Sequence, residues 1–102
     1  METHRITERE FEAQVKDLAK MFGWKYYHTW RSIHSPAGFP DCVFVRERVV
    51  FAELKTDIGQ PSPEQYEWLA TLAEAGQESY LWRPDDIEEI AELLRGNNES
   101  SR

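Results

Sequence analysis

Apolar side chains recur at helical spacing near the start of the chain, between residues 6 and 22. Thr7 and Glu10 have the spacing of a capping box, which opens a helix, and Gly23 is a natural helix stop. Because the apolar positions share one stripe, they predict an amphipathic helix with one buried face. The stripe consists of Phe11, Val15, Leu18, Ala19 and Phe22.

From residue 24 to residue 54 the pattern changes to that of β-strands. Residues 24–30 are rich in aromatic side chains that alternate between two faces, and they predict a first strand. Residues 43–45 and 49–54 are dominated by β-branched and aromatic side chains, which favour strands. The polar break at residues 46–48 is short enough for a turn, so the second and third strands should form a hairpin.

A second helix opens at Ser62 with several consistent signals. Ser62 suits the N-cap, Pro63 suits the first helical position, and Gln65 can close a capping box with Ser62. Gly76 is placed to end this helix. The helix should therefore occupy the segment between the hairpin and the last strand.

The rest of the chain completes an α/β pattern. Residues 79–82 predict a short last strand, and a final helix should begin at Pro84 and stop at Gly96. The order is αβββαβα, which predicts a mixed central sheet flanked by helices. We expect one domain over residues 1–96 and a flexible tail over residues 97–102.

Charge is distributed unevenly along the 102 residues, whose formal net charge is −7. Residues 1–60 hold nine Lys/Arg and nine Asp/Glu, whereas residues 61–102 hold three and ten. This balance argues against a simple basic nucleic-acid binder. If DNA is the partner, it should meet the first half of the chain.

Composition also narrows the cellular setting. No stretch approaches the ~20 apolar residues of a membrane span, and the N-terminus has no signal-peptide pattern. Cys42 is the only cysteine, which excludes an internal disulfide and a cysteine-rich zinc site. We therefore expect a cytoplasmic protein without a membrane partner.

Candidate chemistry gathers on the predicted hairpin. Alternation along the strand places Glu53 and Lys55 on one face, and hairpin pairing should bring Asp41 near Glu53. Two carboxylates and one lysine at the mouth of a small sheet suit a divalent metal and a phosphate. The alternative is a solvated strand end beside an ordinary Pro-Asp turn.

The spacing of these residues resembles a known nuclease motif. Asp41, eleven intervening residues and then Glu53-Leu54-Lys55 resemble the core motif of the PD-(D/E)XK nuclease superfamily. The flanking segments look like the VRR-NUC family of that superfamily, and the resemblance covers about residues 6 to 83. These segments are Gly38-Phe39-Pro40-Asp41 upstream, and Ser62-Pro63-Glu64-Gln65 and Trp68-Leu69 downstream.

The resemblance implies a metal-dependent active site. Asp41 and Glu53 would hold Mg²⁺ or Mn²⁺, and the backbone carbonyl of Leu54 would add a ligand. Lys55 would orient the attacking water or stabilise developing charge. By resemblance to resolvase-type members, Glu12 would lean from the first helix towards Asp41 and Glu53 and complete the site. From the residues alone, Glu12 is equally well interpreted as a surface acid.

Other residues have two open interpretations. Gln65 caps its helix or, as the resemblance implies, faces the active site and positions the lysine or the attacking water. The polar loop that leads into Asp41 contacts phosphates or is a mobile connection. The positions that we expect to bind DNA are Arg31, Ser32, His34 and Ser35 in this loop, and Arg46 and Arg48 in the hairpin turn.

These expectations combine into one functional hypothesis. The chain resembles stand-alone VRR-NUC nucleases of the Holliday-junction-resolvase type, which implies a Mg²⁺- or Mn²⁺-dependent endodeoxyribonuclease. We expect a homodimer that cuts branched DNA, either a four-way junction or a flap, in a bacterium or a phage. The alternatives are a non-catalytic member of the fold that binds DNA or protein, and a nuclease subunit of a larger complex.

Overall fold

The computed structural model describes residues 5–30 and 34–96, and it confirms the αβββαβα order. The first strand is shorter than predicted, because its ladder with the second strand ends at the pair His28 and Cys42. The predicted tail over residues 97–102 lies outside the described residues. The elements are α1 (Glu8–Met21), β1 (Lys25–His28), β2 (Cys42–Val45), β3 (Val49–Leu54), α2 (Pro63–Glu74), β4 (Glu78–Trp82), a 3₁₀ turn (Pro84–Asp86) and α3 (Ile87–Arg95).

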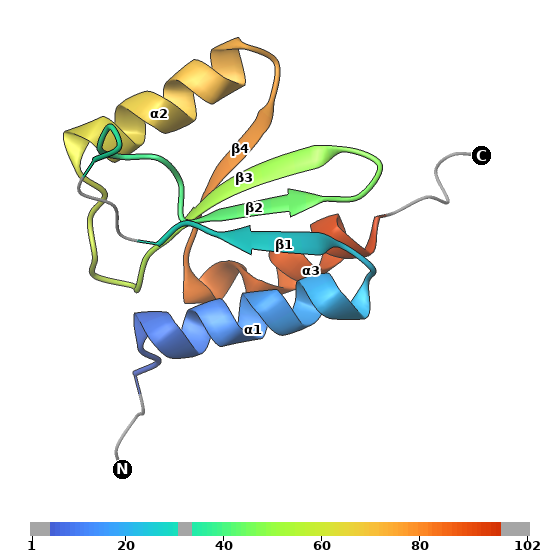
Figure 1. The fold of residues 1–102 in the computed structure, drawn as a ribbon. Coiled ribbons are helices and arrows are strands. Elements are labelled where there is room, and N and C mark those ends of the chain that lie inside the picture. Colours follow the sequence, from blue (N-terminus) through green and yellow to red (C-terminus); the bar gives the residue numbers. More distant parts are fainter. Residues whose placement is uncertain (1–4, 31–33, 97–102) are drawn as a thin grey trace.

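The four strands form one mixed sheet in the order β1-β2-β3-β4. β1, β2 and β3 are antiparallel neighbours, whereas β4 runs parallel to β3. A parallel pair needs a crossover connection, which α2 provides. Figure 1 shows α1 and α3 on one face of the sheet and α2 on the other.

The hydrophobic core lies between the sheet and the pair α1 and α3. Trp24 closes one end, where its indole N–H donates to the carbonyl of Leu94 at 2.7 Å. By contrast, α2 contributes no buried residue. The fully buried apolar side chains include Phe11, Val15 and Ala19 of α1, Phe44, Val50, Ala52 and Leu54 of the sheet, and Ile90 and Leu94 of α3.

The sheet face that carries α2 is only partly covered. α2 packs against β4 at one side of the sheet, as Figure 1 also shows. Val45 of β2 and Tyr27 of β1 share this face and stay 43% and 63% exposed. In the described part of the chain, no helix is long and apolar enough to cross a membrane.

Candidate active site

The hairpin joins Asp41 and Glu53 at the end opposite its turn. Cys42 of β2 pairs with Ala52 of β3, so Asp41, which precedes Cys42, lies beside Glu53, which follows Ala52. The backbone N–H of Asp41 donates to Glu53 Oε1 at 3.2 Å, and the N–H of Leu54 donates to Asp41 Oδ2 at 3.0 Å. The predicted approach of the two carboxylates is therefore present in the structure.

Glu53 is the only charged residue among the buried residues that the structure describes. Burial, and after it the charge of Asp41, raise the pKa of its carboxyl from 4.5 to about 8, although Lys55 opposes the shift. Lys55 Nζ lies 3.5 Å from Glu53 Oε2, with its side chain 18% exposed. Without a further cation, the Glu53 carboxyl would therefore keep its proton near neutral pH.

Gln65 caps its helix and also contacts the candidate site, whereas its role in positioning the lysine or the attacking water stays a prediction. Its Oε1 accepts from the backbone N–H of Ser62 at 2.8 Å, which caps α2. Its Nε2 donates to Glu53 Oε2 at 2.6 Å. The start of α2 is thereby tied to the buried carboxylate, and the amide can hold Glu53 in a fixed orientation.

The donor set at this point fits a hard divalent cation. Asp41 and Glu53 offer carboxylate oxygens, which Mg²⁺ and Mn²⁺ prefer. The raised pKa of Glu53 is the expected consequence of burying one acid beside another, which Lys55 opposes but does not cancel. Within residues 5–30 and 34–96, no group of three or more His, Cys, Asp or Glu side chains is arranged as a metal cluster. The protein ligands of a metal would thus centre on these two carboxylates, and the Leu54 carbonyl as a ligand stays a prediction.

Glu12 lies beside β1, with partners on two side chains of that strand. The Tyr26 hydroxyl donates to Glu12 Oε2 at 2.9 Å. The same oxygen lies 3.0 Å from the buried Nδ1 atom of His28. This distance is short enough for an ion pair, but the two groups are not aligned for a hydrogen bond. The charges of Asp41, Glu12 and Glu53 all act on Cys42, whose pKa is raised to about 12, chiefly by burial. Glu12 therefore faces the same end of the sheet as the other two acids.

Glu8 is a further candidate for the site that the sequence did not single out. Although its side chain is exposed at the start of α1, partial burial of its carboxyl raises its pKa. Lys55 lowers that pKa, whereas Asp41 and Glu12 raise it, so Glu8 lies within electrostatic range of all three. The available signal was its position four residues before Glu12, which puts both acids on one helix face.

A tightly docked loop sets the position of Asp41. Gly38 has φ of +98°, and a Cβ there would lie 2.6 Å from the backbone carbon and oxygen of Glu64. The Trp68 indole donates to the Ala37 carbonyl at 3.2 Å, and the rings of Phe39 and Trp68 meet edge to face. Only glycine permits this approach to α2, so Gly38 fixes the path of the chain into Asp41.

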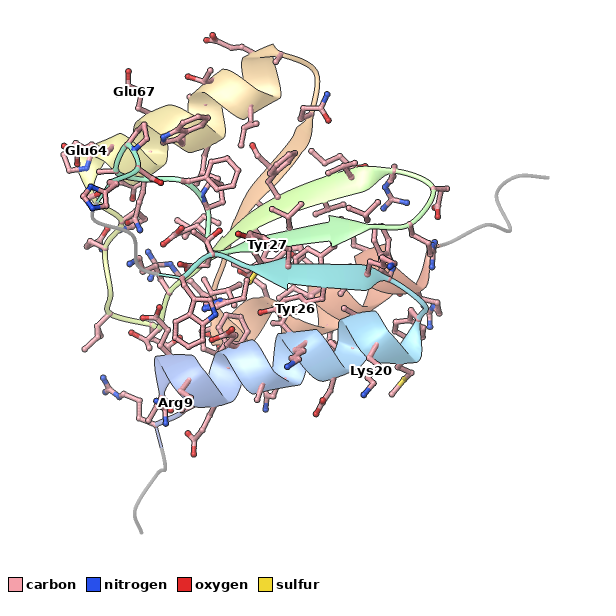
Figure 2. The ribbon with its side chains drawn as sticks, viewed as in Figure 1. Arg9, Lys20, Tyr26, Tyr27, Glu64 and Glu67 are labelled. Atoms are coloured by element: carbon pink, nitrogen blue, oxygen red, sulfur yellow. The ribbon has the colours of Figure 1, made fainter. Side chains whose placement is uncertain are left out.

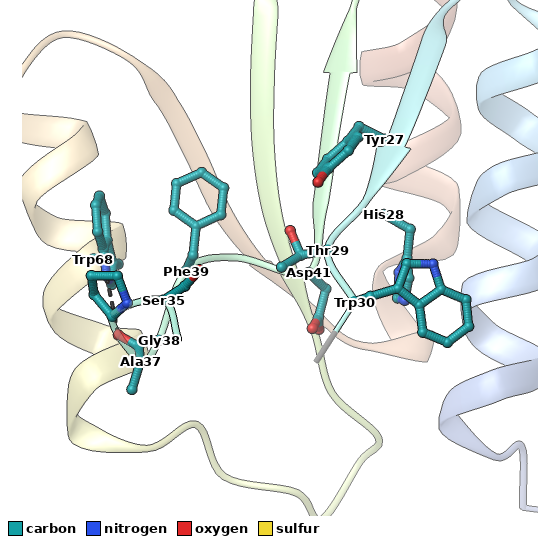
Figure 3. A pocket seen from close by; sticks show the side chains of 11 residues that line it. Tyr27, His28, Thr29, Trp30, Ser35, Ala37, Gly38, Phe39, Asp41 and Trp68 are labelled. Carbon is teal, nitrogen blue, oxygen red and sulfur yellow. Dashed lines mark hydrogen bonds between the residues drawn. The ribbon is translucent and has the colours of Figure 1, made fainter. Parts of the chain in front are cut away.

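A pocket of about 960 Å³ opens beside Asp41, between this loop and the end of β1. Phe39 and Trp68 line one side and Tyr27 and Trp30 the other, with Asp41 between them (Figure 3). Such a hollow next to two carboxylates can receive part of a substrate while a phosphate lies at the acids.

The predicted DNA-binding residues of the loop have different outcomes. Arg31 and Ser32 lie outside the described residues. His34 and Ser35 are exposed, and Ser35 lines the pocket that contains Asp41. Their contact with phosphates stays a prediction, and Ser35 is the better placed of the two for the site.

Arg46 and Arg48 lie in the hairpin turn, at the end of the hairpin away from Asp41 and Glu53. Arg46 donates to the carbonyls of Phe22 and Leu94 at 2.9 and 3.2 Å. Both guanidinium groups also lie over the Trp24 ring, at 4.6 and 5.3 Å from its centroid. Their evident role is to fasten the turn to the helical layer. A role for them in DNA binding stays a prediction.

Two solved structures share this fold. One, described as "VRR_NUC domain protein", is 20% identical with a TM-score of 0.74, and the match covers 94% of this chain and 91% of the other. Another, described as "VRR_NUC domain", is 18% identical with a TM-score of 0.73, covering 90% and 99%. No protein-family model and no curated protein matches the chain. These similarities confirm the predicted resemblance at the level of the fold: the chain has the fold of VRR_NUC domains.

Proposed function

We propose that this protein is a divalent-metal-dependent endonuclease that hydrolyses phosphodiester bonds of DNA. The observation that carries the proposal is the Asp41 and Glu53 pair at the end of a hairpin. The Asp41 N–H donates to the Glu53 carboxylate, and the N–H of Leu54, the residue after Glu53, donates to the Asp41 carboxylate. Lys55 lies 3.5 Å from the buried Glu53 carboxylate. The shared fold with VRR_NUC domains supports a nuclease built on this pair.

In this proposal Asp41 and Glu53 hold Mg²⁺ or Mn²⁺ through carboxylate oxygens. When bound, the ion supplies Lewis-acid chemistry: it withdraws charge from the scissile phosphate and makes water more acidic. Glu53 cannot turn away from the site, because its carboxylate accepts from Gln65 and from the backbone of Asp41. The cation would relieve the repulsion that raises the pKa of Glu53.

Lys55 acts on the negative charge that develops during cleavage. The Lys55 side chain is only 18% exposed and its ammonium is paired with Glu53, so its field is only weakly screened. A fixed positive charge at this place stabilises the transition state or orients the attacking water. Gln65 serves as a positioning residue, because it reaches the site through Glu53.

The two acids of α1 complete the electrostatic environment. Glu12, fixed by Tyr26, extends the acidic surface from Asp41 towards β1. Glu8 lies within range of Lys55 and Asp41. Both carboxylates would add to the negative field that attracts a cation held by Asp41 and Glu53.

The substrate and assembly in this proposal are branched DNA and a homodimer. A two-fold dimer suits a four-way junction, which is itself close to two-fold symmetric. Val45, exposed on the sheet face that α2 leaves uncovered, offers an apolar surface for a second copy. The buried thiol of Cys42 is consistent with a reducing cytoplasm as the place of action.

The test is cleavage of a panel of labelled DNAs by the purified protein with Mg²⁺, Mn²⁺ or EDTA. The panel holds a four-way junction, a flap, a nicked duplex and a plain duplex of equal length. We expect metal-dependent cutting that Asp41→Asn and Glu53→Gln abolish, whereas Glu88→Gln, an exposed acid of α3, cuts like the wild type. Binding without cutting of any DNA in either metal would support the non-catalytic alternative.

A further inference from the structure

Two aromatic side chains beside the candidate active site are unusually exposed. Trp30 is 80% exposed and Tyr27 is 63% exposed. Large rings of this kind are normally buried, because burying them stabilises the fold. Both lie at the end of β1, which is an edge strand of the sheet. Their exposure next to Asp41 points to a ligand rather than to packing within the chain.

These rings belong to a continuous hollow surface, here called the β1 groove. The pocket of about 960 Å³ at Asp41 and a second hollow of about 530 Å³ share Tyr27, His28 and Trp30. The second hollow extends along α1 to Lys16 and Lys20. The β1 groove therefore runs from two lysines, past two exposed rings, to a candidate metal ligand. Figure 2 shows Lys20 on α1 and Tyr27 on the neighbouring β1.

In the β1 groove, the Trp30 ring contacts His28, which is itself held beside Glu12. The Trp30 ring meets the ring of His28 at 66°, with centroids 5.7 Å apart, so the two do not stack. His28 is held beside Glu12, and Glu12 accepts a hydrogen bond from Tyr26. This chain of contacts places Trp30 at the mouth of the Asp41 pocket while most of its ring stays accessible.

The charge around the β1 groove differs from that of the whole molecule. The chain carries a net charge of −7, yet Lys16 and Lys20 line the far part of the groove. Lys16 Nζ also lies 5.8 Å from the centroid of the Tyr26 ring. Lysines that lie beside exposed aromatic faces are the arrangement that binds single-stranded nucleic acid, through phosphates and base stacking. Contact with the backbone of a duplex alone would not require exposed rings, since paired bases are already stacked.

We propose that the β1 groove binds unpaired nucleotides of the DNA strand that is cut. Bases stack on Trp30 and Tyr27, and Lys16 and Lys20 contact the phosphates of the same segment. This inference rests on the proposed function and selects among its branched DNAs those with a single-stranded segment adjoining the scissile phosphate, such as a flap. A second protein copy is the competing occupant, but the lysines and the continuity with Asp41 favour a nucleic acid.

Binding without metal separates this inference from the nuclease activity. Fluorescein-labelled single-stranded oligo(dT) and a blunt duplex with the same number of phosphates are titrated with the wild-type protein in EDTA at low salt. We expect the single strand to bind more tightly and to quench tryptophan fluorescence. Trp24 and Trp82 are 5% exposed, so quenching reports mainly on Trp30 and Trp68.

Variants identify which side chains carry the binding. Trp30→Ala should weaken oligo(dT) binding about tenfold, the loss expected for one stacked base, and should remove most of the quenching. Lys16→Ala and Lys20→Ala should each reduce the salt dependence of binding. Tyr66→Ala, another exposed aromatic residue on α2, and Arg95→Ala on α3 are the matched controls and should bind like the wild type. Circular dichroism verifies that each variant is folded.

The outcomes are distinct from those of the cleavage test. Weaker binding by Trp30→Ala with unchanged controls supports the β1 groove, even if no DNA is cut. Equal oligo(dT) affinity for the wild type and Trp30→Ala overturns the inference, as does a preference for the duplex. Protection of Trp30 from acrylamide quenching in the free protein would also overturn it, because a second copy would then cover the ring.

Discussion

Glu53 is the side chain of the site whose ionised form costs the folded protein most, because its carboxyl is buried. It is 0% exposed, and its pKa is raised to about 8 by burial and by Asp41. When a carboxyl binds its proton more tightly in the folded state than in the unfolded state, its ionisation lowers the free energy of unfolding of the protein. The arrangement is tolerated because Gln65, Lys55 and the Asp41 N–H all contact Glu53.

The metal-free protein should therefore lose stability as pH rises from about 4.5 to about 8, relative to Glu53→Gln. Below this range the carboxyl is protonated in both states, and its burial carries no ionisation cost. Above it the full cost is present, a difference of a few kcal/mol. Urea unfolding in EDTA at pH 5, 7 and 8.5 measures both proteins. Parallel stability profiles would show that Glu53 does not titrate in this way.

Glu8 and Glu12 of α1 are the two further acids whose contribution to cleavage can be tested one residue at a time. Glu12 is the acid that the family resemblance favours, whereas Glu8 lies within electrostatic range of Lys55 and Asp41. We expect Glu12→Gln and Glu8→Gln each to reduce cleavage by about tenfold or more, as residues around a metal site do. Asp17→Asn, an exposed acid of the same helix, is the control and should cut normally. If both α1 variants match this control, both are surface acids.

Sequence reasoning reached the Asp41 and Glu53 pair because hairpin register is a local property. Alternation and a short turn are enough to place one carboxylate beside the other. The position of Glu8 relative to Lys55 depends on how α1 packs on the sheet, which no local pattern encodes. The same holds for Arg46, whose partners Phe22 and Leu94 lie far from it in the sequence.

At the scale of elements, the start of α2 couples three parts of the site. Ser62 and Gln65 cap the helix, Gln65 reaches Glu53, and Gly38 packs against the backbone of Glu64. The capping signals predict the helix start correctly. The close approach of Gly38 could not be predicted, because it depends on the distance between two segments of the backbone.

Gly38→Ala should disturb this junction more than a comparable change elsewhere. An added Cβ would meet the Glu64 backbone at 2.6 Å, in addition to the cost of a positive φ. We expect a loss of about 1–3 kcal/mol in the free energy of unfolding and lower activity, because the chain into Asp41 shifts. Gly23→Ala is the matched control, with φ of +82° and open space around the new Cβ. Equal losses in the two variants would mean that the packing at Gly38 is unimportant.

At the scale of the whole molecule, the proposed function requires a small acidic chain to hold a large anionic substrate. The molecule has 102 residues and a net charge of −7, and α2 leaves part of one sheet face open. A second copy would cover exposed apolar surface and bring two sites together. The sequence suggested a dimer through its resemblance to Holliday-junction resolvases, and the structure places the exposed apolar positions without assigning their partner.

We expect a homodimer in solution that Val45→Glu shifts towards monomer. Val45 is 43% exposed on the open sheet face, and a buried unpaired charge there would oppose association. Multi-angle light scattering at micromolar concentration measures the mass directly. Ile58→Glu, an exposed apolar residue in the loop after β3, is the control and should stay dimeric. A wild-type monomer, alone and with junction DNA, would remove the two-fold geometry from the proposed function.

The most direct test of the account is calorimetric titration of Mn²⁺ into the wild type, Asp41→Asn, Glu53→Gln and Lys55→Ala. Because the two carboxylates are the proposed ligands and an ammonium cannot be one, the wild type and Lys55→Ala should bind the ion. Asp41→Asn and Glu53→Gln should weaken binding by about tenfold or more. Lys55→Ala should nevertheless fail to cut DNA. Equal Mn²⁺ affinity in the wild type and both carboxylate variants would contradict the assignment of this site.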